Sequence, residues 1–235
     1  MVSIVIPNYN NAKYLKDCVA SCPNTCEIIV VDDCSTDNSV DMLNELPVKT
    51  IVLPENKGVS TARNEGIIAS TGEFVILLDS DDMLIPESVQ KRLDIFTPEI
   101  DVVYGYMRKV HGDISFSDAY SHVGKWERHP SEFTAPMYRR TVFQRFGLFH
   151  EPLRSKEDKE MAYRLGVHRK SYCPPRINFI KADIDVMFYR RHENAKRKRR
   201  ASDLMFDIET CMEFDKRCKD IEIYGITEQN TRLLK

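Results

Sequence analysis

Residues 74–82 read FVILLDSDD, a run of five apolar residues that leads into three aspartates and a serine. A short, uninterrupted apolar run bounded by polar residues is typical of a strand buried on both faces of a parallel sheet. The same order recurs at residues 28–33, which read IIVVDD. The two stretches therefore predict two buried strands with carboxylates clustered at their carboxyl ends.

Strand and helix patterns alternate around these stretches. Apolar runs predict strands at residues 3–6, 27–31, 50–53 and 74–78. Amphipathic segments of helical length lie between and after them, at residues 12–20, 39–46, 59–70 and 86–96. This alternation, with short connections, predicts an α/β fold with a Rossmann-like, mostly parallel sheet flanked by helices.

The pattern is less regular beyond residue 101. It predicts strands at 102–110 and 184–189 and helices at 140–146, 157–165 and 201–218, whereas 117–136 read as irregular. No internal repeat or low-complexity linker divides the chain. We therefore expect a single domain over residues 1–235. Its first half is residues 1–110, its second half is residues 111–200, and a helical extension follows at 201–235.

The charges are unevenly distributed. The 235 residues carry 34 Lys and Arg against 36 Asp and Glu, a net charge of -2. Residues 1–100 hold 7 basic and 16 acidic side chains, a balance of -9, and residues 101–235 hold 27 and 20, a balance of +7. This split predicts that the two halves meet different ligands, with an acidic half suited to a cation and a basic half suited to an anion.

Neither a membrane span nor a secretion signal is predicted. The longest apolar run, residues 74–78, is far shorter than the roughly 20 residues that cross a bilayer, and the N-terminus lacks a basic, then apolar, leader pattern. Seven cysteines form an odd set without the paired spacing of a zinc site. Cys18, Cys22 and Cys26 recur every fourth residue, but Pro23 interrupts that helix. We expect reduced thiols and a cytoplasmic protein.

Aspartates at two strand ends suggest chemistry. Asp32 and Asp33 follow one predicted strand, and Asp79, Asp81 and Asp82 follow another. Ligands bind at the carboxyl ends of parallel strands, and neighbouring carboxylates repel one another unless a cation compensates. Helix capping is the alternative, since one aspartate at each place could satisfy free N–H groups. Capping does not explain five aspartates, so the pattern favours metal or nucleotide binding.

Four motifs in a fixed order resemble the family 2 glycosyltransferases of the GT-A fold. They are SIVIPNYN at 3–10, VVDDCSTD at 30–37, NKGVSTARNEG at 56–66 and LLDSDD at 77–82. The resemblance is dense over the first 90 residues and looser to about residue 195. It implies transfer of a sugar from a nucleotide diphosphate, most often UDP, with inversion and with Mn²⁺ or Mg²⁺. Residues 1–110 would then bind the nucleotide-sugar and residues 111–200 the acceptor.

The resemblance also implies roles in nucleotide binding. Pro7 and Tyr9 would form the wall of the base pocket, where an aromatic ring can stack on uracil. Asp33 would accept a hydrogen bond from the base, with Asp32 beside it. Simple core packing is the alternative for Tyr9.

Roles at the ribose and the diphosphate follow from the same resemblance. Arg63 would reach the nucleotide, Asp79 would bind the ribose, and Asp81 would hold the metal. His192, in a Tyr-Arg-Arg-His element at 189–192, would ligate the metal or donate to a phosphate. A surface salt bridge is the alternative for Arg63, and a structural role is the alternative for His192. Residues 193–195 depart from the small serines common in the family.

The expected base is a carboxylate ahead of a helix. By resemblance, Asp158 would take the proton from the acceptor hydroxyl, and Glu157 would contact the acceptor or the base. Both side chains could instead only stabilise the helix N-terminus through its dipole.

The basic run Lys196–Arg200 has three interpretations. It is a solvated segment, it closes over the donor diphosphate, or it attracts an anionic partner such as a membrane surface or an acidic glycan. Nucleic acid is the least supported partner, because aromatic residues for base stacking are scarce there. Trp126 packs either against a sugar or in the core. The acceptor is a glycan, a lipid-linked or another hydroxyl compound.

Two other functions compete with glycosyl transfer. One is a phosphatase of the haloacid dehalogenase type, because Asp79-Ser80-Asp81 follows an apolar strand. Met83 stands where such enzymes have a threonine, and three strand–helix units precede the motif, which argues against it. The other is a nucleotide-sugar-binding module without activity, which measured turnover would distinguish.

Overall fold

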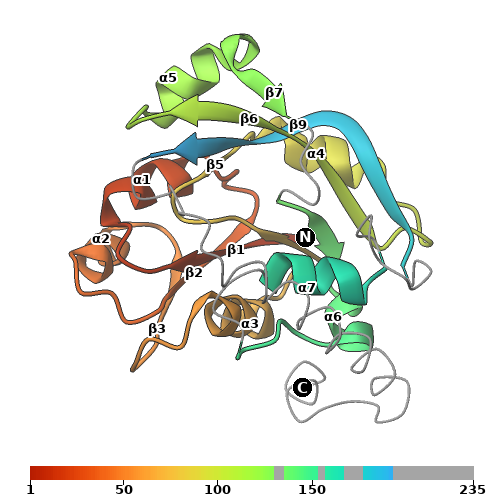
Figure 1. The fold of residues 1–235 in the computed structure, drawn as a ribbon, viewed down its shortest axis with the longest axis horizontal. Coiled ribbons are helices and arrows are strands. Elements are labelled where there is room, and N and C mark those ends of the chain that lie inside the picture. Colours follow the sequence, from red (N-terminus) through yellow and green to blue (C-terminus); the bar gives the residue numbers. More distant parts are fainter. Residues whose placement is uncertain (130–134, 153–156, 167–176, 193–235) are drawn as a thin grey trace, which may run out of the picture.

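The computed structural model describes residues 1–129, 135–152, 157–166 and 177–192 (Figure 1). Its strands are β1 (Val2–Asn8), β2 (Glu27–Asp32), β3 (Lys49–Val52), β4 (Phe74–Leu77), β5 (Met83–Leu84), β6 (Val102–His111), β7 (Glu127–His129), β8 (Met137–Arg139) and β9 (Phe179–Arg191). Its helices are α1 (Ala12–Ala20), α2 (Ser39–Glu45), α3 (Val59–Ala69), α4 (Glu87–Leu93), α5 (Phe116–Ser121), the 3₁₀ turn η1 (Val123–Lys125), α6 (Thr141–Phe146) and α7 (Glu157–Arg164).

All of these strands belong to one sheet with the order β3-β2-β1-β4-β8-β6-β9-β5, and β7 pairs with β6. The first four neighbours, β3, β2, β1 and β4, are parallel, as the alternating pattern predicts. Beyond them the sheet is mixed: β8 is antiparallel to β4 and to β6, and β5 is antiparallel to β9, whereas β6 and β9 are parallel. The expected single α/β domain is therefore half parallel and half mixed.

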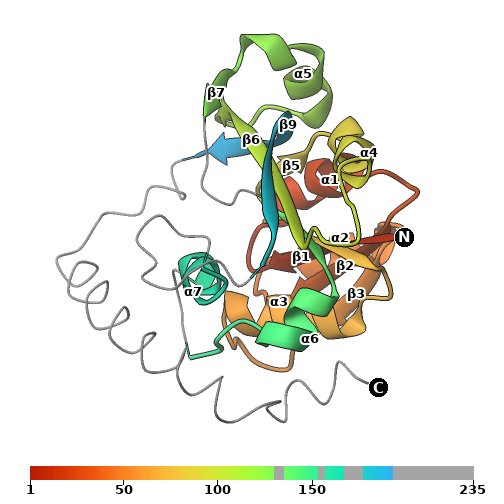
Figure 2. The same cartoon turned by 90° about the vertical axis from the view of Figure 1, so that its right-hand side faces the viewer.

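The central strands of the parallel half, β1 and β4, are buried on both faces. All seven residues of β1 are buried. Ile4 and Ile6 join a cluster that includes side chains of α1, α2 and α4, whereas Val5 joins a cluster that includes side chains of α3, α6 and α7. Figure 2 shows these two sets of helices on opposite sides of the sheet. This sandwich explains why β1 reads as a continuous apolar run rather than an alternating one.

Helix α3 lies unusually close to β1. A Cβ atom at Gly66 would lie 2.2 Å from Cγ1 of Val5, closer than two carbon atoms can approach. Because α3 follows β3, it begins on the side of the sheet that is formed by the carboxyl ends of the parallel strands. Its first turns therefore stand beside the carboxyl ends of β1 and β4.

Residues 117–136 are not irregular throughout, contrary to the expectation. Helix α5, the η1 turn and β7 occupy much of this stretch. Ser115 caps α5: its hydroxyl accepts a hydrogen bond from the N–H of Asp118. The spacing Ser115-x-x-Asp118 is a helix-start signal in the sequence. The missed β8 has only three residues and the missed β5 only two, too short for a periodicity to be visible.

Trp126 is partly buried and packs against a core cluster. It packs against the cluster of Met83, Ile85 and Val110, and its Nε1 donates to the backbone oxygen of Ala119 at 3.0 Å. Cys18 and Cys22 are buried free thiols. Burial raises the pKa of Cys22 to about 12, which keeps this thiol protonated.

Within the described ranges, none of the helices has both the length and the apolar character needed to cross a bilayer. The predicted helix at 201–218 and the basic run Lys196–Arg200 lie outside the described residues.

Candidate active site

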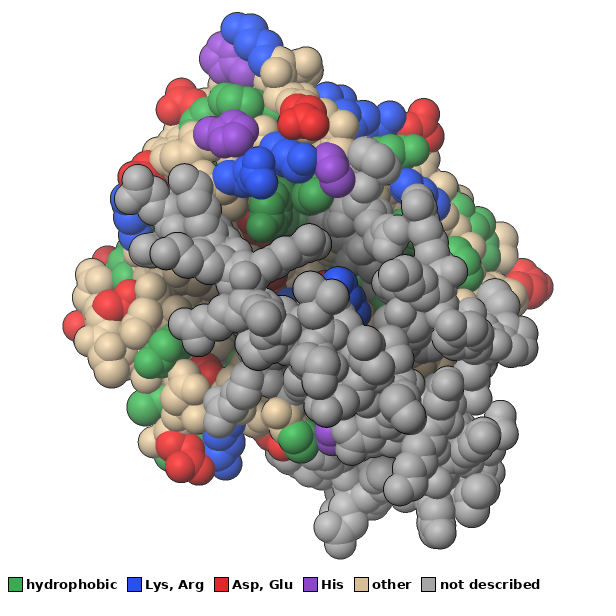
Figure 3. Space-filling view, in the orientation of Figure 1, with side chains coloured by type: hydrophobic (Ala, Val, Ile, Leu, Met, Phe, Trp, Pro, Cys, Tyr) green, Lys and Arg blue, Asp and Glu red, His purple; other side chains and the backbone are tan. Residues whose placement is uncertain are grey.

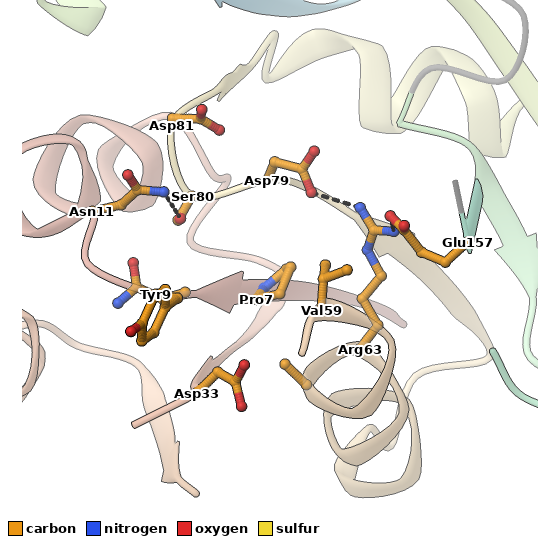
Figure 4. Close-up of a pocket in the computed structure, with 12 residues that line it drawn as sticks. Pro7, Tyr9, Asn11, Asp33, Val59, Arg63, Asp79, Ser80, Asp81 and Glu157 are labelled. Carbon is orange, nitrogen blue, oxygen red and sulfur yellow. Dashed lines mark hydrogen bonds and ion pairs between the residues drawn. The ribbon is translucent and has the colours of Figure 1, made fainter. Parts of the chain in front are cut away.

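The carboxyl end of β1 is a topological switch point. The chain passes from β1 to β2 on one side and later places β4 on the other side of β1. Crevices at such points are where open α/β sheets bind ligands. A cavity of about 220 Å³ opens here. Its lining residues are Pro7, Asn8, Tyr9, Asn11, Asp33, Val59, Ala62, Arg63, Asp79, Ser80, Asp81 and Glu157 (Figure 4).

Most of the residues expected at the site lie in this wall. They are Pro7, Tyr9, Asp33, Arg63, Asp79, Asp81 and Glu157. Three expected residues, Asp32, Asp158 and His192, do not line the cavity but adjoin residues that do. The four motifs, distant in sequence, thus converge on one cavity.

Tyr9 is not a core residue. Its side chain is 46% exposed, and Figure 4 shows it at the cavity, on the far side of Pro7 from Arg63. An exposed ring at a cavity wall can stack on a planar ligand group.

Asp33 and Asp32 hold backbone and side chains in place. Asp33 accepts hydrogen bonds from the N–H groups of Lys57 and Gly58, each at 2.7 Å, and so fixes the turn that leads into α3. Each carboxylate oxygen keeps a second lone pair for a ligand. Asp32, fully buried, accepts from Asn8 Nδ2 at 2.7 Å and from the backbone N–H of Ser35 at 2.8 Å. Asp32 therefore supports the cavity wall from behind.

Arg63 is a buried residue rather than a surface one, with 8% exposure. Its Nη2 donates to Asp79 Oδ1 at 2.7 Å, and its Nη1 donates to Glu157 Oε1 at 2.6 Å. Burial alone would lower the pKa of Arg63, but the facing carboxylates of Asp79 and Glu157 raise it above its usual value. The guanidinium therefore joins the end of β4 to the start of α7 (Figure 4).

Asp81 lies against His192, since His192 Nε2 and Asp81 Oδ2 are 2.9 Å apart. Burial and the neighbouring Asp79 raise the pKa of Asp81. Burial, Asp81 and Asp79 raise the pKa of Asp82 well above its usual value. The loop thus brings three carboxyl groups close together, and a nearby cation would stabilise their ionised forms.

The loop is held by Arg190. The Arg190 Nε donates to the backbone oxygen of Asp81 at 2.9 Å, and the Arg190 N–H donates to Asp82 Oδ1 at 2.8 Å. Its Nη1 donates to the backbone oxygen of Ile114 at 2.6 Å. This buried arginine places His192, two residues later on the chain, beside Asp81.

The residues at this loop suit a cation that shares its coordination with a ligand. Within the described ranges, no group of three or more His, Cys, Asp or Glu side chains is placed to hold a metal alone. Mg²⁺ and Mn²⁺ commonly take one or two protein ligands and complete their coordination with substrate phosphates and water. Among the residues that the structure describes, the buried Nδ1 atom of His192 has no hydrogen-bond partner. Asp81 and His192 therefore fit such a metal, provided that a phosphate is bound with it.

The first turn of α7 carries two neighbouring carboxylates, one of which contacts the Arg63 guanidinium. Glu157 is 8% exposed and engaged by Arg63, whereas Asp158 is exposed and accepts a hydrogen bond from the N–H of Lys159. The charge of Asp158 also contributes to the raised pKa of Arg63. Because Glu157 is buried against Arg63, Asp158 is the more accessible of the two carboxylates to a ligand.

The far end of α7 is fixed as well. Arg164 is buried, pairs with Glu160 at 2.7 Å, and donates to the backbone oxygens of Gly147 and Leu148 at 3.1 and 2.9 Å. Acidic residues in the first turn also favour the helix dipole, so the dipole interpretation and a catalytic role are compatible.

Several residues of the wall were not predicted from the sequence: Asn8, Asn11, Val59, Ala62 and Ser80. Asn11 Nδ2 donates to Ser80 Oγ at 3.0 Å, which links the start of α1 to the loop after β4. Asn8 and Asn11 lie at the carboxyl end of β1, so their position at a strand end is the same signal that marks the aspartates.

A model of the family described as Glycosyl transferase family 2 matches residues 3–153. The chain belongs to this family. The glycosyltransferase GlyG of Streptococcus pneumoniae serotype 4 is 26% identical, over 96% of this chain and 82% of GlyG. Other relatives, 32–36% identical, match over less than half of their own length.

Solved structures show the GT-A fold. The S. aureus TarS 1-349 structure in complex with UDP-GlcNAc has a TM-score of 0.67 and 21% identity, covering 98% of this chain and 69% of that one. The mannosyltransferase PcManGT of Pyrobaculum calidifontis, in complex with GDP-Man and Mn²⁺, has a TM-score of 0.60 and 14% identity, covering 99% and 78%. The predicted family and fold are therefore confirmed.

Proposed function

We propose that this family 2 domain transfers a glycosyl group from a nucleoside diphosphate sugar, with UDP as the favoured nucleotide, to an acceptor hydroxyl. The reaction is an inverting single displacement. The observation that supports it best is that residues of all four motifs and Glu157 of α7 meet in one cavity at the switch point of the sheet.

The donor would lie along the ends of β1, β2 and β4. Tyr9 offers an exposed ring for the base, with Pro7 beside it, and Asp33 keeps lone pairs for a donor group on the base. Asp79 is half-exposed and held by Arg63, so its free oxygen can accept from a ribose hydroxyl. Asp32 serves indirectly by holding Asn8.

Asp81 and His192 would hold Mn²⁺ or Mg²⁺ together with the diphosphate. The bound cation supplies charge neutralisation for the leaving diphosphate. The complex of PcManGT with GDP-Man and Mn²⁺ supports a divalent metal in this fold. Arg190 holds the backbone of the loop in place.

Asp158 would be the base. In a single displacement the acceptor oxygen bonds to the anomeric carbon as the bond to the diphosphate breaks, and the acceptor proton passes to the Asp158 carboxylate. Glu157, tied to Arg63, stands next to it and orients the start of α7. Positioned general bases typically contribute about 10²–10⁴-fold in rate.

The nucleotide is assigned by analogy. TarS was crystallised with UDP-GlcNAc and with UDP, which supports a UDP-sugar donor here. The acceptor would be a glycan, a lipid-linked or another hydroxyl compound that binds residues of the 111–200 half. Contact of Lys196–Arg200 with an anionic membrane surface stays a prediction, because that run lies outside the described residues.

UDP binding measured by calorimetry, first with Mn²⁺ and then with EDTA, tests the donor site. We expect binding that requires the metal, followed by slow hydrolysis of one member of a panel of UDP-sugars. Failure of UDP, GDP and dTDP to bind in either condition would refute the proposal.

The same measurements separate the alternatives. A binding module without activity would bind UDP and hydrolyse no nucleotide-sugar. The phosphatase interpretation is not supported, because the Asp79-Ser80-Asp81 motif lies within the residues matched by the family 2 model.

A further inference from the structure

Two adjacent residues of α3, Arg63 and Asn64, hold the segment that leads to α7. Asn64 has no exposed surface. Its Nδ2 donates to the backbone oxygen of Phe149 at 2.9 Å, and its Oδ1 accepts from the backbone N–H of Phe149 at 2.8 Å. One side chain thus satisfies both backbone groups of one residue, as a neighbouring strand would.

The Asn64 side chain also contacts Glu151, two residues further along this segment. Its Nδ2 lies 3.2 Å from Oε1 of Glu151, a second acceptor for the same amide group. Because the amide pairs with both a backbone donor and a backbone acceptor, only one orientation of the side chain satisfies them. The position of residues 149–151 relative to α3 is therefore closely defined.

Phe149 connects this clamp to Arg63. The Arg63 guanidinium carbon lies 5.5 Å from the centre of the Phe149 ring, and the same guanidinium binds Glu157. Phe149 is itself 2% exposed and packs on Phe143 with the ring centres 6.4 Å apart. A shift of Phe149 would therefore move the guanidinium that holds the first residue of α7.

We propose that Asn64 is a positioning residue for Asp158, the base assigned under the proposed function, on which this inference rests. Asn64 fixes Phe149, and Phe149 supports Arg63. Arg63 in turn holds Glu157, so the neighbouring Asp158 is kept in a defined position relative to the donor end of the cavity. Asn64 itself does not line the cavity, unlike Arg63.

The prediction is a loss of turnover without a loss of donor binding. A misplacement of about 1 Å at a reacting group can cost about a hundredfold in rate. For Asn64→Ala we expect kcat for hydrolysis of the best UDP-sugar of the panel to fall by about tenfold to a hundredfold, with the Kd for UDP in Mn²⁺ within about twofold of the wild type.

A second variant and a control keep the test independent of folding. Phe149→Leu keeps the backbone bonds to Asn64 but removes the ring beneath Arg63, and we expect a smaller fall in kcat in the same direction. Ser70→Ala, at the other end of α3, removes a buried hydroxyl that donates to the backbone oxygen of Ile67 at 2.7 Å. Ser70→Ala should lower the melting temperature and leave kcat unchanged.

Each outcome is decisive. A fall in kcat with Kd and KM retained in Asn64→Ala, together with a smaller fall in Phe149→Leu, supports the positioning role. Unchanged kcat in a folded variant that binds UDP normally overturns it and leaves the proposed function intact. Parallel losses of UDP affinity and kcat, matched by Ser70→Ala, indicate stability alone and overturn it too. A wild-type protein that binds UDP but hydrolyses no UDP-sugar overturns both proposals.

Discussion

The parallel and the mixed halves of the sheet are stabilised by different interactions. In the parallel half, β1 and β4 are buried along their whole length and meet apolar side chains on both faces. In the mixed half, β6, β7 and β9 are held partly by charges: Asp185 binds both Arg108 and Arg128, each at 2.6 Å. Figure 3 shows Lys, Arg and His side chains gathered over these strands.

This difference explains where the polar groups of the site arise. A strand buried on both faces has few polar positions along its length, Ser3 of β1 being one, so most of its polar residues collect where it ends. Asp33, Asp79 and Asp81 occupy such ends. In the mixed half, polar residues lie along the strands themselves and take part in structure, as Asp185 does. The comparison predicts that charge changes in the two halves have different consequences.

The largest effect is expected for Asp158→Asn, on the helix that faces the parallel half. The substitution removes the proton acceptor but keeps the shape of an exposed side chain. Turnover of a UDP-sugar should fall by about 10²–10⁴-fold, with UDP affinity retained. Kinetics and calorimetry on the same preparation check this, and turnover at the wild-type rate would exclude Asp158 as the base.

Asp81→Ala should weaken UDP binding in Mn²⁺ by about a hundredfold, the scale expected for losing a charged metal ligand. In EDTA the variant and the wild type should bind equally weakly. The matched control is Asp41→Asn, an exposed carboxylate on α2 in the same half. If Asp81→Ala keeps metal-dependent binding, the metal is held elsewhere.

Arg63 joins the loop after β4 to the start of α7, and its loss should affect stability. Arg63→Ala leaves the buried carboxylate of Glu157 without its partner. Breaking a buried pair in this way lowers the free energy of unfolding by about 3–5 kcal/mol. Urea unfolding of Arg63→Ala, Glu157→Gln and the double variant forms a cycle. The double variant should be more stable than Arg63→Ala; additive losses would mean that the pair contributes no coupling.

The smallest effect on stability is expected for alanine substitution of two glycines, one in each half. Gly66→Ala forces a Cβ against Val5 and should lower the free energy of unfolding by about 1–3 kcal/mol. Gly124→Ala meets no atom within 4 Å and should stay within about 0.5 kcal/mol. Equal losses at both positions would show that close packing of α3 on β1 is not the cause.

The elements of the parallel half could be predicted from the sequence more fully than those of the mixed half. Strands β1, β2 and β4 could be placed because largely continuous burial produces apolar runs, and the helices because they are amphipathic. In β9 only residues 184–189 were predicted, yet the strand begins at Phe179. Lys181, Asp183 and Asp185 alternate there with less polar residues, and such alternation is a strand signal that their charges obscured.

The candidate site shows a similar limit. The motifs predicted which side chains meet at the strand ends, and the cavity contains most of them. The sequence did not reveal that Asp32 is fully occupied by Asn8 and Ser35, or that Arg63 joins Asp79 to Glu157. Such pairings depend on contacts between residues far apart in the chain, which a local pattern does not specify.

Trp126 gives the molecule a natural optical probe of one half. It is the single tryptophan of the chain, and it packs with Val110, Ala119 and Phe188 in the layer formed by β6, α5 and β9, away from the residues that line the cavity. Tryptophan emission should therefore stay constant during a nucleotide titration and shift to longer wavelength when this layer becomes solvated. Followed with far-ultraviolet circular dichroism in one urea titration, it reports whether the mixed half unfolds together with the parallel half or before it.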